Sequence, residues 1–89
     1  MRIDDLAWDE VNVEHIARHG VSPDEVEDVC YGFHFCRKEK GQRYILGGKT
    51  AGGKYLDIVV EKTGEFVFRP ITAFEMSENY KASYRRRMG

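Results

Sequence analysis

Apolar and polar residues alternate with a period of two through the middle of the chain. Three runs rich in aromatic and β-branched residues are separated by breaks at Gly47–Gly53 and Lys62–Glu65; the runs are Tyr44–Leu46, Tyr55–Val60 and Phe66–Ile71. This pattern predicts an antiparallel meander of three strands. In the second run the alternation sends one set of residues to each face of the sheet: Leu56, Ile58 and Val60 to one, and Tyr55, Asp57, Val59 and Glu61 to the other.

Two helices are predicted before the meander. Asp9 is a candidate N-cap for a helix over Glu10–Arg18 that ends at Gly20. The apolar stripe of this helix is expected from Val13, Ile16 and Ala17.

The second helix has the stronger start signal. Ser22 is followed by Pro23 at the first helical position and by Glu25 at capping-box spacing. Gly32 is expected to end this helix. Its core-facing residues are predicted to be Val26, Val29 and Cys30.

The remaining segments complete an α+β fold. Ile3–Trp8 is expected as a short edge strand or an extended arm, and alternation over Phe33–Lys38 predicts a strand before the meander. Ser77–Arg87 is predicted to be helical, with an alternative start at Thr72, which has capping-box spacing to Glu75. We therefore expect two N-terminal helices, an antiparallel sheet of about four strands and a C-terminal helix.

In that last helix Tyr80 and Tyr84 share one face. We expect one of them to pack in the core and the other to lie at the surface.

Length and composition indicate one domain over residues 1–89. Charged residues make up 33% of the chain and proline is scarce, which argues against disorder. No apolar run approaches the roughly 20 residues of a membrane span. The first ten residues contain Asp4, Asp5, Asp9 and Glu10, unlike a signal peptide, so a cytoplasmic location without membrane association is expected.

The net charge of -1 conceals an asymmetry. Residues 1–30 carry a net charge of -7 and residues 31–89 a net charge of +6. Such asymmetry is typical either of a basic surface that binds a partner such as nucleic acid, or of an ordinary surface on which folding intermingles the two charges.

The cysteines and histidines do not form a metal-binding motif. Cys30 and Cys36 are not a C-x-x-C pair, and His15 and His19 lack the glutamate of H-E-x-x-H. No metal or other cofactor is therefore expected. A regulator that binds metal through these residues is a weaker alternative.

Several short segments, in order along nearly the whole chain, resemble the BrnT toxins. They are Trp8-Asp9, His19-Gly20-Val21-Ser22, Arg43 at the start of a strand, Gly53 and Leu56 in the next, Arg69–Ala73 (RPITA), and Met76-Ser77 before the terminal helix. BrnT toxins belong to the RelE-like ribonucleases of bacterial type II toxin–antitoxin systems. The chain departs from the family pattern at Thr72 and Phe74, where relatives commonly carry serine and arginine.

The resemblance implies a RelE-like α+β fold and metal-independent endoribonuclease activity that halts translation. It also implies a cognate antitoxin, usually a ribbon-helix-helix protein, which masks the toxin and represses the shared operon. Operator DNA would then be bound only through the antitoxin. The alternative is a non-catalytic relative that pairs with an antitoxin-like protein and tunes transcription.

RNA cleavage without a metal needs removal of the proton from the attacking 2′-hydroxyl, stabilisation of the phosphate charge and proton transfer to the leaving 5′-oxygen. Arg43 and Arg69 are the first candidates to hold the phosphate, and pairing with Asp57 or Glu61 is the structural alternative. His19 and Tyr84 are candidates for proton transfer. Further RNA contacts are predicted for Lys49, Lys54, Arg85 and Arg86.

Lys49 lies in the segment GGKTAGG. The segment lacks the Walker spacing, so it is interpreted as a hairpin loop or an RNA contact rather than a nucleotide-triphosphate loop.

Overall fold

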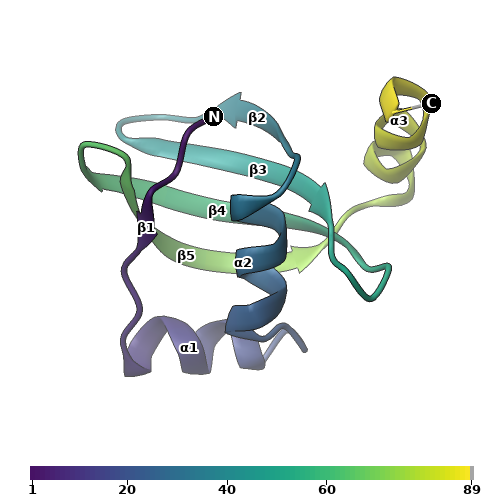
Figure 1. Cartoon of the computed structure of the whole chain (residues 1–89). Helices are drawn as coiled ribbons and strands as arrows, with labels where there is room; N and C mark the ends of the chain where they lie inside the picture. The colour runs from purple at the N-terminus through teal and green to yellow at the C-terminus, as the bar shows by residue number, and fades with distance from the viewer. Residues whose placement is uncertain (89) are drawn as a thin grey trace.

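A five-stranded sheet forms the centre of the computed structural model, which describes residues 1–88 (Figure 1). The elements follow in the order β1 (Asp5–Leu6), α1 (Glu10–Ala17), α2 (Pro23–Tyr31), β2 (Phe35–Lys38), β3 (Arg43–Lys49), β4 (Tyr55–Gly64), β5 (Val67–Glu75) and α3 (Glu78–Met88). The α+β class and the order of helices and strands are as the sequence predicts. None of the described helices is both long and apolar enough to cross a membrane.

The two N-terminal helices begin where their capping signals predict. The Asp9 side chain accepts from the backbone N–H of Asn12, and the Asn12 side chain accepts in return from the N–H of Asp9. Ser22 and Glu25 form the same reciprocal pair at the start of α2, with Pro23 in its first turn. Each cap satisfies backbone donors that a helix start otherwise leaves unpaired.

The core lies between the sheet and α2, which crosses in front of the sheet in Figure 1. Leu56, Ile58 and Val60 are fully buried there, as the alternation predicts. The predicted α2 residues are buried against them: Val26, Val29 and Cys30. The stripe of α1 is narrower than predicted, because Ala17 is exposed while the polar Asn12 is buried.

The sheet has five strands rather than about four, in the order β1-β5-β4-β3-β2. The four strands from β2 to β5 form the antiparallel part, and β1 pairs with β5 in parallel through Asp5 and Leu6. The sheet is therefore mixed. A two-residue parallel strand has no hairpin and no room for alternation, so the sequence left open whether this segment is a strand or an arm.

Gly47 and Gly48 lie inside β3, where the sequence suggested a loop. A Cβ on Gly48 would come within 2.9 Å of Val29 in α2, and a Cβ on Gly47 within 3.1 Å of Met76 on the opposite face. The two glycines thus allow close packing on both faces of one strand. As a result Lys49 is a strand residue, and the prediction that it lies in a loop was wrong.

The turn between β3 and β4 covers residues 50–54 and is attached to the helices. The N–H of Ala51 donates to the Asp28 carboxylate, and the Lys54 ammonium donates to the carbonyl of Gly20. This hairpin loop therefore packs against α2 and the turn that precedes it.

α3 begins at Glu78, one residue later than predicted, and the alternative start at Thr72 is wrong because Thr72 lies in β5. The expected division between the two tyrosines is confirmed: Tyr84 is buried and Tyr80 is 51% exposed. Tyr84 packs edge-on against the rings of Phe35 and Tyr55.

Candidate functional site

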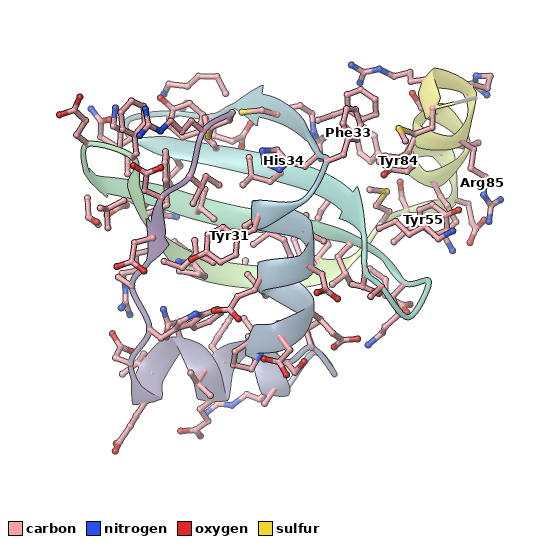
Figure 2. All side chains as sticks on the ribbon, in the orientation of Figure 1. Tyr31, Phe33, His34, Tyr55, Tyr84 and Arg85 are labelled. Carbon is pink, nitrogen blue, oxygen red and sulfur yellow. The ribbon has the colours of Figure 1, made fainter. Side chains whose placement is uncertain are left out.

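The face of the sheet opposite α2 carries the polar residues of β4, and α3 lies across one end of it. We call it the open face; it includes Tyr55, Asp57, Val59 and Glu61. Figure 2 shows Tyr55, Tyr84 and Arg85 close together beside α3. Because α3 packs here, residues from β2, β3, β4 and the C-terminal helix meet at one end of the open face.

Three cations surround the Tyr55 ring. Lys49 is its cross-strand partner on β3, and the ammonium groups of Lys49 and Lys81 each lie 5.6 Å from the ring centroid. Arg85 lies over the same ring at 5.0 Å and its Nε donates to the phenol oxygen at 3.4 Å. We call Lys49, Tyr55, Lys81 and Arg85 the Tyr55 cluster.

The cations change the acidity of the phenol. The hydrogen bond from Arg85 is the largest cause that lowers the pKa of Tyr55, and the charges of Lys49, Arg85 and Lys81 lower it further against the cost of burial. A positive surround stabilises the phenolate relative to the phenol. Tyr55 therefore gives up its proton more readily than an ordinary tyrosine.

Carboxylates leave most of this positive charge uncompensated. Lys81 lies 3.5 Å from Glu78, whereas Lys49 and Arg85 form no salt bridge within residues 1–88. Such a group of cations at the surface favours an anionic ligand such as a phosphate.

Beside the Tyr55 cluster, a pocket of about 110 Å³ lies between α3 and the sheet. Arg37 forms a salt bridge with Asp57 at 3.1 Å in this pocket. Asp57 is 3% exposed, and its burial raises the pKa of the carboxyl group although Arg37 opposes the shift. We call it the α3 pocket; its lining comprises Phe35, Arg37, Gly47, Asp57, Met76, Tyr80, Ser83, Tyr84 and Arg87.

Arg43 and Arg69 lie farther along the sheet, in one cross-strand row with Glu61 between them. Two strand spacings, about 10 Å, separate their backbones. Arg43 pairs with Glu61 at 3.2 Å, and Arg69 pairs with Asp9 at the start of α1. The structure thus brings the two arginines into one row, but each is engaged by a carboxylate. The structural alternative is confirmed for Arg43, whereas the partner of Arg69 is Asp9 rather than Asp57 or Glu61.

The two proton-transfer candidates lie in different surroundings. His19 is exposed just after α1, with its ring 5.3 Å from that of His15. Tyr84 is buried, and burial together with Tyr55 raises the pKa of its phenol. Tyr84 therefore keeps its proton and serves as a wall between the Tyr55 cluster and the α3 pocket, since it lines both.

The four predicted RNA contacts lie in three different places. Lys49 and Arg85 belong to the Tyr55 cluster. Lys54 instead faces the helices and pairs with Glu25 at 3.1 Å. Arg86 is exposed on α3, and its neighbour Arg87 lies 3.6 Å over the ring of Phe35.

Two features of the site escaped the sequence analysis: the role of Tyr55 and the pairing of Arg37 with Asp57. A usable signal existed, since alternation places Tyr55 and Asp57 on one face of β4, and a hairpin through residues 50–54 sets Lys49 opposite Tyr55. The packing of α3 onto that face had no comparable signal.

The alternative of a regulator that binds metal through the cysteines and histidines finds no support in the positions of these residues. Cys30 is buried, and burial raises the pKa of its thiol to about 12, whereas Cys36 is exposed. Across residues 1–88, no three His, Cys, Asp or Glu side chains are grouped so that they could hold a metal ion.

Comparison with known proteins gives no relative. No family model, no curated protein and no solved structure matches the chain. The resemblance to BrnT toxins therefore rests on the order of short sequence segments.

Proposed function

We propose that this protein is an RNA-cleaving toxin of the BrnT type, acting at the Tyr55 cluster. The observation that carries the proposal is a phenol of lowered pKa in contact with three cations at the end of a sheet. The order of BrnT-like segments supports the same class of function.

The chemistry follows from what the side chains offer. A scissile phosphate held by Lys49 and Arg85 is attacked by the adjacent 2′-oxygen, whose proton passes to a water molecule, and the positive charges stabilise the additional negative charge of the transition state. Tyr55 donates its proton to the leaving 5′-oxygen, and the cations stabilise the phenolate until water returns the proton. The products are a 2′,3′-cyclic phosphate end and a 5′-hydroxyl end.

The proposed partner is a cognate antitoxin of the ribbon-helix-helix class, and its support is the family resemblance. In the resting complex the antitoxin covers the open face and excludes RNA. Operator DNA is contacted through the antitoxin, and the complex works in the cytoplasm.

Expression in a bacterial host tests the proposal. The wild-type chain is expected to arrest growth and fragment RNA, and Tyr55→Phe to lower cleavage by about 100-fold or more because it removes the proton donor and keeps the ring. Asn79→Ala, an exposed change on α3, is the matched control and should leave both readouts unchanged. Normal growth with intact RNA on wild-type expression would refute the proposal.

A non-catalytic binding module is the second candidate. It is favoured by the engagement of both Arg43 and Arg69 by carboxylates, because these arginines were the first candidates to hold a phosphate. Co-expression with the product of a neighbouring small gene separates the two functions. A stable complex combined with no toxicity of the free chain would identify the binding module.

A further inference from the structure

The α3 pocket combines stacking surfaces with paired hydrogen-bonding groups. Phe35, Tyr80 and Tyr84 contribute aromatic rings to its walls. Arg37 lies over Tyr80 at 4.2 Å, and Arg87 lies over Phe35 at 3.6 Å. Aromatic rings and guanidinium planes are the surfaces on which proteins stack unpaired RNA bases.

The polar groups of the pocket form an adjacent donor and acceptor. The guanidinium of Arg37 donates and the carboxylate of Asp57 accepts, and the two are joined at 3.1 Å. The Watson–Crick edge of guanine carries the complementary set: the O6 acceptor beside the N1–H and N2–H donors. Cytosine and adenine match the pair less well, because each offers the carboxylate one amino group and has a ring nitrogen acceptor where guanine has its N1–H donor.

The floor of the pocket depends on Gly47. A Cβ at this position would lie 3.0 Å from the Asp57 carboxylate and 3.1 Å from the Met76 methyl group. The pocket is open to solvent and small, at about 110 Å³, so it admits the edge of a planar base rather than a whole nucleotide.

We propose that the α3 pocket is a subsite for an unpaired guanine base, with Asp57 accepting from the base edge and Arg37 donating to it. As a specificity site for RNA, this inference rests on the proposed function. Tyr84 separates the subsite from the Tyr55 cluster, so a base in the pocket and a phosphate at the cluster belong to neighbouring parts of one RNA strand.

Titration of nucleosides into the ¹⁵N-labelled protein tests the subsite, because nucleosides carry no phosphate. Guanosine is expected to give saturable shifts at the backbone amides of Arg37, Asp57 and Tyr84. Inosine lacks the 2-amino donor and should bind roughly tenfold more weakly, as should cytidine and adenosine. This comparison uses the wild-type chain and does not depend on the folding of any variant.

Two variants locate the effect. Asp57→Asn removes the charged acceptor and should remove the preference for guanosine over inosine. Ser83→Phe narrows the pocket from the α3 side and leaves both residues of the Arg37–Asp57 salt bridge in place. It should weaken the binding of all four nucleosides to a similar extent. Asn79→Ala is again the control and should bind as wild type does, with circular dichroism used to check that each variant is folded.

The outcomes separate this inference from the proposed function. Equal binding of guanosine and inosine, or shifts confined to residues outside the pocket, would overturn the guanine subsite even when RNA is cleaved. Selective guanosine binding by a chain that leaves RNA intact would support the subsite and contradict the ribonuclease proposal.

Discussion

The two ends of the open face carry similar residues in different electrostatic states. At one end, Arg43 and Arg69 flank Glu61, and carboxylates engage both arginines. At the other end, Lys49 and Arg85 contact the Tyr55 ring and form no salt bridge in the part of the chain that the structure describes. The comparison teaches that available charge, rather than the number of arginines on a sheet, distinguishes a candidate phosphate site.

The two ends also differ in burial. Asp57 lies beneath α3 and is 3% exposed, whereas the Glu61 side chain is 41% exposed. Interactions between charges are stronger in the less hydrated environment, and an uncompensated charge is more costly there. Substitutions of equivalent residues at the two ends should therefore change the free energy of unfolding by unequal amounts.

The largest expected difference concerns stability. Arg37→Ala leaves the buried Asp57 without its partner and should lower the free energy of unfolding by about 3 kcal/mol. Arg43→Ala breaks an exposed pair and should lower it by less than about 1 kcal/mol. Urea denaturation of both variants measures the difference, and equal losses would show that the two ends do not differ in this respect.

The next largest difference between the two ends of the open face is expected in their contributions to RNA affinity. Lys49→Ala combined with Arg85→Ala should weaken binding of a single-stranded RNA by roughly 10- to 100-fold and reduce its salt dependence. Arg43→Ala combined with Arg69→Ala should weaken it less than about threefold, because these cations are already paired. Fluorescence anisotropy over a salt series makes the measurement. The reverse ranking would return the site to Arg43 and Arg69.

The contributions of Asp9 and Asp57 to stability should change in opposite directions as the pH falls. The Arg69 hydrogen bond chiefly lowers the pKa of Asp9, so its contribution to stability is present above about pH 4 and is lost as the pH falls through the lowered value. Burial raises the pKa of Asp57, so protonation on acidification relieves a cost of folding. Melting temperatures between pH 3 and 7 should fall less steeply for Asp9→Asn than for wild type, and more steeply for Asp57→Asn.

Asparagine is the appropriate replacement at position 9 because it also caps helices. Parallel pH profiles for the wild-type chain and Asp9→Asn would contradict the assigned role of the Arg69–Asp9 pair.

The smallest expected effect is spectroscopic. Tyr55 should ionise at lower pH than an ordinary tyrosine, and Arg85→Ala should move its ionisation toward the ordinary value because the largest cause of the shift is removed. Absorbance at the phenolate band during alkaline titration, compared with Tyr55→Phe, isolates this residue. An unchanged titration in Arg85→Ala would remove the basis for the Tyr55 cluster.

Local signals were sufficient to predict most of the fold. The capping residues of α1 and α2 act within four positions of each other, and alternation in β4 depends only on neighbouring residues. Interactions distant in sequence were not predictable in this way. The parallel pairing of Leu6 with Phe68 and the packing of Tyr84 on Phe35 join segments separated by about half the chain or more.

The candidate site was predicted in part for the same reason. Lys49 and Arg85 were selected as basic residues, but their meeting at Tyr55 depends on the position of α3. Arg43 and Arg69 were selected from the family pattern, and their pairing with Glu61 and Asp9 depends on sheet register and on the approach of α1. The glycines of β3 predict a turn, because composition alone does not distinguish a turn from close packing.

The buried side chain of Asn12 has a consequence for self-association. Its amide donates to the carbonyls of Ala7 and Pro70, and His15 contacts the hydroxyl of Thr72, so α1 closes the margin of β5 beyond the two-residue β1. Strand addition by another chain is thereby directed to the opposite margin, along β2. There the exposed Lys38 places like charges on any two copies that approach edge to edge, which disfavours growth into fibrils.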